Sequence, residues 1–331
     1  MTVRVRGRIE RFPLRRPFAI SRGAKTEAVV LVVELDDGQF VGSGHSVPYP
    51  RYGENAAGCL RLLDTLSFAA PAQTIEGLSR GALRSALGSA LLALEAKRDS
   101  RRAYEVLGVP PPEPLPIAST ITVAPPKAMA EDAARATSTT LKLKVGGDAK
   151  DLERVRAVRE ASPDATILID ANEGWDLSLY RSLLPELVEL GVALIEQPFP
   201  SDRDEALRDL PRPIPICADE SLVGAVTPDD LADRYDAVNI KLEKAGGVRE
   251  ALAQMEAATE LGLRTMLGCM VGSSLSVAPA ILLGGLADWV DLDGACFLDG
   301  EPSPRLRYAE GRVWPLEGTV WGTRKSLHGS R

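Results

Sequence analysis

The chain has 331 residues, 45% of them hydrophobic and 26% charged, which is ordinary for a globular protein and excludes a disordered or fibrous one. Asp and Glu number 46 against 39 Lys and Arg, so the formal net charge is −7, and no basic run offers the electrostatic footprint of a nucleic-acid-binding protein. The length allows a large core and favours one or two domains.

Two scarce residue types narrow the chemistry. The only histidines, His45 and His328, lie far apart in the chain, so we expect neither a His-based zinc site nor a Ser-His-Asp triad. The four cysteines form no C-x-x-C pair and are predicted to be buried thiols of a reducing compartment. Because the first residues lack the apolar stretch of a signal peptide and no apolar run of about eighteen residues follows, we expect a cytoplasmic protein without membrane association.

Residues 1–45 are predicted to form the strands of an N-terminal α+β domain. The β-branched run Ala28–Glu34 (AVVLVVE) favours a strand, and Asp37-Gly38 favours a hairpin turn into the next one. Between the first strands, the segment Pro17–Lys25 (PFAISRGAK) is predicted to be a polar loop that is able to move.

A helix and a proline-rich boundary end this domain at residue 112. Leucines recur at spacings of three and four across Gly81–Val106, which predicts a helix with one face packed on a core. Five prolines in Pro110–Pro116 (PPPEPLP) then form a stiff linker, because proline fixes φ and removes the N–H donor. We therefore expect a domain of residues 1–112.

Beyond this boundary, residues 113–303 alternate short apolar strands with amphipathic helices. Eight strands are expected: Ile117–Val123, Thr139–Val145, Thr166–Ala171, Val192–Gln197, Ile214–Asp219, Ala237–Leu242, Thr265–Met270 and Trp289–Asp293. This regular alternation is typical of βα units around a parallel sheet, and eight strands predict a closed (β/α) barrel. An open doubly wound sheet is the alternative, but no G-x-G-x-x-G follows the first strand. Residues 304–331 are predicted to form a hairpin that returns to the N-terminal domain.

Charged residues end most of the predicted strands, at the face where the active sites of parallel barrels lie. Asp170, Glu196 and Asp219 end the third, fourth and fifth strands, one βα unit apart. Charges in the low-dielectric mouth of a barrel are costly unless they pair or bind an ion. Three converging carboxylates favour an all-oxygen site for a hard cation, and Mg²⁺ suits it better than zinc, which prefers His or Cys.

Lysines stand on both sides of these carboxylates. Lys142 and Lys144 alternate with leucines and so share one face of the second strand, while Lys241 ends the sixth. A metal-held substrate carboxylate between two lysines is arranged for abstraction of the proton α to that carboxylate. A lysine base must be neutral, so we expect burial and neighbouring positive charge to lower its pKa. With one lysine on each face, removal and return of the proton would epimerise the substrate.

Five motifs, KLK, IDAN, IEQP, ADES and NIKLEKAGG, occur in this order and spacing and resemble the muconate-lactonizing branch of the enolase superfamily. The resemblance covers nearly the whole chain. It implies an α/β fold, a modified (β/α)7β TIM-like barrel with an N-terminal α+β capping domain that the C-terminal tail completes. Within this branch, WVDLDGACFL is similar to the D-x-D segment of dipeptide epimerases, and PFAISRGAKTEA and PYPRYGE resemble the cap loop and its neighbour in L-Ala-D/L-Glu epimerases.

By this resemblance, Lys144 and Lys241 are the acid–base pair, and Lys142 supports the substrate carboxylate and tunes Lys144. The implied ligands of Mg²⁺ are Asp170, Glu196 and Asp219. The implied reaction is a two-lysine 1,1-proton transfer through an enediolate, which epimerises the C-terminal residue of L-Ala-D/L-Glu and belongs to peptidoglycan recycling. The chain would then be an isomerase whose partner is a small dipeptide.

Four further residues are implied to bind the dipeptide. Asp291 and Asp293 alternate on the eighth strand, so both project to one face and would receive the α-ammonium group. Arg22 in the cap loop would meet the side-chain carboxylate of a C-terminal Glu, and Thr120 on the first strand would contact the substrate backbone.

Other functions fit parts of this pattern. A cycloisomerase or an o-succinylbenzoate-synthase-like enzyme uses the same lysines and metal without needing the D-x-D segment. Lys241 stands where some class I aldolases of this fold carry a Schiff-base lysine, and a binding module that has lost catalysis is a third alternative. A mandelate-racemase-type mechanism needs a barrel His, which residues 46–327 lack. Gly272 and His45 stand where relatives carry acidic residues. The preferred substrate is therefore left open, and epimerisation of a dipeptide other than L-Ala-D/L-Glu is a further alternative.

Overall fold

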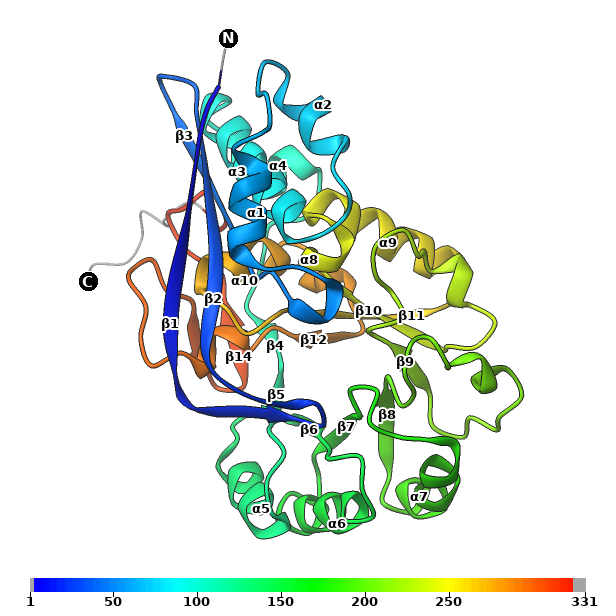
Figure 1. The fold of residues 1–331 in the computed structure, drawn as a ribbon. Helices are drawn as coiled ribbons and strands as arrows, with labels where there is room; N and C mark the ends of the chain where they lie inside the picture. The colour runs from blue at the N-terminus through cyan, green and yellow to red at the C-terminus, as the bar shows by residue number, and fades with distance from the viewer. Residues whose placement is uncertain (1–2, 324–331) are drawn as a thin grey trace, which may run out of the picture.

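The computed structural model describes residues 3–323 and has two main parts, a cap and a barrel (Figure 1). The cap holds a three-stranded antiparallel sheet of β1 (Arg4–Ile20), β2 (Gly23–Asp36) and β3 (Val41–Ser46), in that order. β1 and β2 form a long hairpin whose turn lies beside β6 and β7 at the barrel (Figure 1). The hairpin therefore connects the cap to the barrel mouth.

The prediction of a polar loop at Pro17–Lys25 is wrong. Phe18–Ile20 pair with Gly23–Lys25, so the hairpin continues to its tip and leaves a turn of two residues. A tertiary contact favours this extension, because the Phe18 ring packs edge-on against Phe297 of the barrel at a centroid distance of 4.8 Å. This apolar anchor is not visible in the local sequence, which is rich in polar residues.

Helices cover the inner face of the cap sheet. They are α1 (Ala56–Leu63), α2 (Pro71–Glu76), α3 (Ala82–Arg98) and α4 (Ala103–Leu107). α3 confirms most of the predicted helix, which breaks at residues 99–102, where Ser100 has a left-handed φ of 53°. β3 lies very close to α3, since a Cβ atom on Gly44 would stand 1.9 Å from the carbonyl oxygen of Ala86. Glycine in β3 thus permits this packing.

Eight parallel strands follow in one sheet, which confirms the predicted TIM-like barrel, although its closure is incomplete. They are β5 (Ala118–Ile121), β6 (Thr140–Lys144), β7 (Thr166–Asp170), β8 (Val192–Glu196), β9 (Ile216–Ala218), β10 (Ala237–Lys241), β11 (Arg264–Gly268) and β12 (Trp289–Asp291). The outer helices are α5 (Pro126–Arg135), α6 (Asp151–Ala161), α7 (Leu177–Glu189), α8 (Leu242–Ala245), α9 (Val248–Glu260) and α10 (Ser274–Ile281). Within residues 3–323, no backbone ladder joins β12 to β5, so a seam remains there.

The two-residue period of the strands divides their side chains between two cores. On β6, Leu141 and Leu143 face outward into the large core shared with the helices. Leu168, Leu194 and Cys217 belong to a small apolar cluster inside the barrel. Each precedes a charged strand-end residue by two positions, so these apolar side chains form the floor beneath the charged groups. Cys59 and Cys217 are buried, as the sequence predicts, but Cys269 and Cys296 are only partly buried.

The end of the chain returns to the segment that joins cap and barrel. β13 (Arg307–Ala309) and β14 (Arg312–Trp314) form the predicted hairpin, and β14 pairs with β4 (Leu115–Pro116). The Ala103 amide of α4 donates to the Val320 carbonyl. The domain limits at residues 112 and 303 stay a prediction, and residues 324–331, with His328, lie outside the described part. No helix among residues 3–323 has the length and apolarity needed to cross a membrane.

Candidate active site

The three predicted metal ligands meet at the carboxyl ends of β7, β8 and β9. Asp170, Glu196 and Asp219 each offer an oxygen, and these atoms lie within 4.8 Å of one another. All three side chains are buried. The Asn172 amide donates to Asp170 Oδ1 (2.9 Å), and Asn239 Nδ2 donates to Glu196 Oε1 (2.8 Å). The carboxylates are therefore held by neighbouring donors, and their hard oxygens suit a divalent cation such as Mg²⁺.

Four lysines pair with this triad of carboxylates: Lys142, Lys144, Lys241 and Lys244. Lys144 donates to Asp170, and Lys241 donates to Asp219 Oδ2 (2.7 Å) from the other side of the triad. Burial alone lowers the pKa of Lys241, but the carboxylates, Asp219 above all, outweigh it and raise that pKa well above its ordinary value. The pairing thus keeps Lys241 charged, contrary to the expectation of a lowered lysine pKa.

Lys142 lies deeper than Lys144 and Lys241 and is fully buried. Its Nζ lies 2.6 Å from Glu196 Oε2, 3.2 Å from Asp170 Oδ2 and 2.6 Å from Asp291 Oδ2. One ammonium group therefore joins the metal triad to the first acid of the D-x-D segment. This position is that of a buried counter-charge, which the alternation of the KLK motif could not show.

The pKa values of the buried carboxylates shift in opposite directions, according to the charges beside each one. Burial and the neighbouring Asp170 raise the pKa of Glu196 to about 8. Burial also acts to raise the pKa of Asp219, but Lys241 and Lys244 hold it well below its usual range. Lys244 donates to Asp219 Oδ1 at 2.6 Å. Sequence reasoning missed Lys244, although it stands three residues after Lys241 within the NIKLEKAGG motif.

The D-x-D segment lies at the seam between β12 and β5. The Thr120 amide donates to Asp293 Oδ2 (2.7 Å), and its hydroxyl lies within 3.4 Å of Asp291 Oδ1. Burial and the charge of Asp291 raise the pKa of Asp293 to about 7. Of these two buried acids, only Asp291 has an ion-pair partner among the described residues, Lys142, so the pair retains affinity for a further positive group.

A cavity of 730 Å³ lies between the hairpin and the barrel mouth. Lys144, Lys241 and Asp219 line its barrel side, while Arg22 and Lys25 line it from the hairpin. The predicted acid–base lysines therefore open into one space. Thr120 and Asp293 instead line a separate cavity of 530 Å³ on the outer side of the seam.

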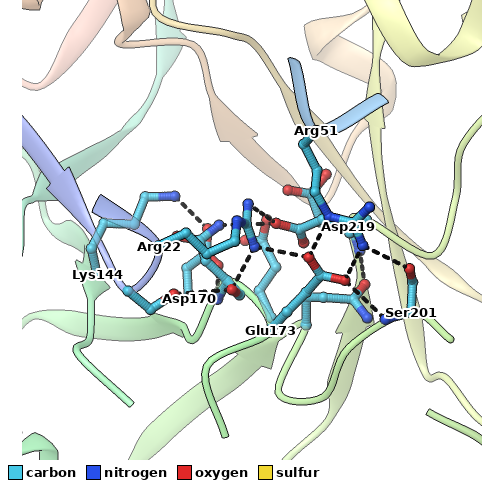
Figure 2. A network of polar contacts seen from close by, with 12 residues as sticks. Arg22, Arg51, Lys144, Asp170, Glu173, Ser201 and Asp219 are labelled. Carbon is cyan, nitrogen blue, oxygen red and sulfur yellow. Dashed lines mark hydrogen bonds and ion pairs between the residues drawn. The ribbon is translucent and has the colours of Figure 1, made fainter. Parts of the chain in front are cut away.

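Arg22, at the hairpin tip, is held by the barrel (Figure 2). Its guanidinium donates to Glu220 (2.6 Å), Glu173 (3.0 Å) and the Asn172 carbonyl (2.5 Å). Arg51 of the cap grips Glu173 with two further bonds, so Glu173 stands between the two arginines (Figure 2). The structure thus gives Arg22 protein partners, beside its place at the cavity wall.

Lys25 is the site residue that sequence reasoning missed most clearly. Its ammonium has no ion-pair partner within the described residues 3–323 and lies 5.7 Å from the Phe18 ring. Burial, with the positive charge of Lys144, lowers the pKa of Lys25 to about 8. The alternation of β2 placed its side chain on the cavity side, a signal that the loop prediction concealed. Gly272 is not among the residues that line this cavity, although Met270 and Val271 just before it are.

Comparison with known proteins gives the class of this fold and site. The model of the family described as "Enolase C-terminal domain-like" matches residues 127–314. The L-Ala-D/L-Glu epimerase of Escherichia coli (strain K12) is 38% identical over 92% of this chain and 97% of its own length. An N-acetyl-D-glutamate racemase of a Pseudoalteromonas species is 38% identical over 88% of this chain and 95% of its own.

Solved structures agree in fold. An enolase family member from Agrobacterium tumefaciens with homology to dipeptide epimerases, bound to sodium and L-Ala-L-Glu, is 41% identical, with a TM-score of 0.87 over 95% of this chain and 98% of its own. A dipeptide epimerase from Methylococcus capsulatus, complexed with Mg and L-Arg-D-Lys, is 30% identical, with a TM-score of 0.85 over 97% and 99%. The chain belongs to the enolase superfamily. Its relatives there are epimerases and racemases, which are isomerases.

Proposed function

We propose that the protein is a Mg²⁺-dependent dipeptide epimerase that inverts the C-terminal residue of L-Ala-D/L-Glu. The observation that carries this proposal is the placement of Lys144 and Lys241, which enter one cavity from opposite sides of a buried carboxylate triad. The identity to a relative named L-Ala-D/L-Glu epimerase supports the choice of dipeptide. A cytoplasmic location and a role in peptidoglycan recycling belong to the same proposal.

In this proposal the two lysines share the proton transfer. One removes the α-proton from its face of the C-terminal residue, and the other returns a proton to the opposite face, which leaves the epimer. Asp170, Glu196 and Asp219 would hold the cation. Bound Mg²⁺ supplies positive charge where negative charge develops on the substrate carboxylate. With a cation on the carboxylates, the lysines are no longer needed as their counter-charges, and one of them is able to give up its proton.

The two ends of the dipeptide would meet opposite charges. Asp291 and Asp293, with Thr120 beside them, would hold the α-ammonium group, which requires the dipeptide to reach from the lysine cavity to the separate cavity that Thr120 and Asp293 line. Lys25 would meet the side-chain carboxylate of the C-terminal Glu, because it faces the cavity without an acidic partner among the described residues. Arg22 would stand at the rim beside it, already paired with Glu220.

A second candidate is racemisation of an N-acylated glutamate, which the 38% identity to an N-acetyl-D-glutamate racemase favours. An acylated amine carries no charge, so its amide would face two buried acids that have a single ion-paired cation among the described residues, Lys142 on Asp291. The buried pair of Asp291 and Asp293 therefore favours a free ammonium group. Turnover of L-Ala-L-Glu against N-acetyl-L-Glu separates the two functions.

The main test is deuterium exchange in D₂O. With Mg²⁺ and L-Ala-L-Glu, deuterium should enter at the α-carbon of Glu, and a chelator should stop it. Lys144→Ala and Lys241→Ala should each abolish exchange from one face, whereas Lys150→Ala, an exposed lysine at the start of α6, should leave both faces active. Absence of deuterium from the product would reject the proposed function.

A further inference from the structure

A buried polar network lies behind the metal triad and has no part in the proton transfer. Its members are Gln197, Asp204, Ser221, Arg234 and Tyr235. Gln197 and Tyr235 are at most 1% exposed. Burying so many polar groups is costly unless each one is satisfied, so a fully bonded network of this kind rigidifies the structure around it.

The Gln197 amide joins the ends of two metal-ligand strands. Gln197 directly follows Glu196 at the end of β8. Its Oε1 accepts hydrogen bonds from the backbone amides of Asp219 (2.9 Å) and Ser221 (3.0 Å), which follow β9. One side chain thus fixes the position of the Asp219 backbone relative to Glu196.

The backbone of Gln197 is itself in an uncommon conformation. Its φ is +36°, in the left-handed region that residues other than glycine rarely adopt. Such conformations are strained and persist where surrounding contacts hold them. The backbone N–H of Gln197 donates to the Cys217 carbonyl (2.8 Å), and the backbone N–H of Glu173 donates to the backbone carbonyl of Gln197 (2.8 Å). The strain is therefore held from both neighbouring strands.

The rest of the network sets which way the amide of Gln197 points. Its Nε2 lies within hydrogen-bond distance of three acceptors, Ser221 Oγ (2.8 Å), the Tyr235 hydroxyl (3.0 Å) and the Phe199 carbonyl (2.9 Å). Both hydroxyls donate their protons to Asp204 Oδ2, at 2.5 and 2.7 Å, so they accept from Gln197. Arg234 Nε donates to Asp204 Oδ1 (3.0 Å). Oε1 consequently has to face the Asp219 amide.

The position of the Asp219 backbone matters because two lysine ammonium groups bind its carboxylate. Lys241 and Lys244 each take one of its oxygens, and Lys244 Nζ also donates to its carbonyl (2.6 Å). We propose that Gln197 and the network of Asp204, Ser221, Arg234 and Tyr235 are positioning residues that set the separation of Glu196 and Asp219 for a divalent cation. This inference rests on the proposed function only in that the triad binds the cation.

The test is a titration of the metal-free full chain with Mn²⁺, in which the electron paramagnetic resonance signal of free Mn²⁺ measures how much is bound. Loss of groups that orient metal ligands commonly weakens metal affinity about 10–100-fold, so Gln197→Met should fall in that range. Tyr235→Phe should weaken Mn²⁺ affinity about three- to tenfold, because Gln197 keeps its other bonds. The matched controls are Gln254→Met and Tyr180→Phe, which remove the same groups from buried residues outside the network. Each should change the Mn²⁺ affinity less than about twofold.

The outcomes separate the inference from the proposed function. No Mn²⁺ binding by the unaltered chain would reject the metal site and the inference with it. Binding by the unaltered chain, with equal affinity in a folded Gln197→Met, would overturn the inference alone. If that variant does not fold, Tyr235→Phe and Ser221→Ala decide in the same way. A non-additive loss in the Tyr235→Phe, Ser221→Ala double variant would support a single coupled network.

Discussion

Glu173 ties the hairpin and the cap to the barrel, and its replacement by Gln should loosen the hairpin tip. The carboxylate accepts from Arg22 Nη1 (3.0 Å) and from Arg51 Nε (2.8 Å) and Nη2 (2.7 Å), and its other donor is the Ser201 amide (2.9 Å). Burial works the other way, but hydrogen bonds from Arg51 hold the pKa of Glu173 below its ordinary value. The group is therefore charged at neutral pH.

The size of the effect follows from this geometry. The Glu173 side chain is 5% exposed, but those of Arg22 and Arg51 are 28% and 38% exposed, so solvent screens part of each pair. Exposed pairs contribute about 0.2–1 kcal/mol each, and a bidentate pair on a buried carboxylate contributes more. Arg51 belongs to the cap and not to the hairpin, and Glu220 and the Asn172 carbonyl still hold Arg22 in the variant. Gln keeps the shape and one acceptor, so we expect the tip to lose about 1 kcal/mol, or roughly fivefold in the ratio of docked to undocked tip.

Hydrogen exchange of the hairpin amides measures that ratio directly. In Glu173→Gln, the amides of Ile20 and Gly23 should exchange about fivefold faster, and KM for the dipeptide should rise by no more than that factor, with kcat little changed. Glu34→Gln is the matched control, because the Arg8–Glu34 pair (2.7 Å) lies at the other end of the same hairpin. Equal exchange at the tip in Glu173→Gln and in the unaltered protein would refute the conclusion that Glu173 helps to hold the hairpin tip on the barrel.

Two further predictions follow from single residues. Lys25→Met should lower kcat/KM for L-Ala-L-Glu about 10–100-fold, the worth of a charge-assisted hydrogen bond, and leave L-Ala-L-Leu nearly unchanged; an equal loss for both dipeptides would contradict the role of Lys25. His45 is buried, and burial lowers its pKa from 6.5 to about 4. Between these values the unfolded chain binds the extra proton, so stability is full above pH 6.5 and falls toward pH 4. In His45→Gln, the fall in the free energy of unfolding over that range should be smaller by up to about 3 kcal/mol; parallel urea-unfolding curves at all pH values would speak against it.

Much of the barrel and its charged mouth is determined locally by the sequence. Short apolar strands at regular spacing predict the parallel sheet, and the period of two fixes which residues face inward. Asp170, Glu196 and Asp219 converge because each stands at the same end of a neighbouring strand. For that reason the carboxylate triad and the flanking lysines were predictable from residue order alone.

Other features depend on which distant segments meet. The polar sequence of the hairpin tip does not show that Phe18 packs on Phe297, and so the loop prediction failed there. Likewise, Arg22 and Lys25 are two cations of one short segment, and only the fold pairs Arg22 with Glu220 and leaves Lys25 facing the cavity. The sequence by itself determined the strands and their inward charges, because these follow from local periodicity; the tertiary structure decided the partners of each charge, because pairing depends on contacts between residues far apart in the chain.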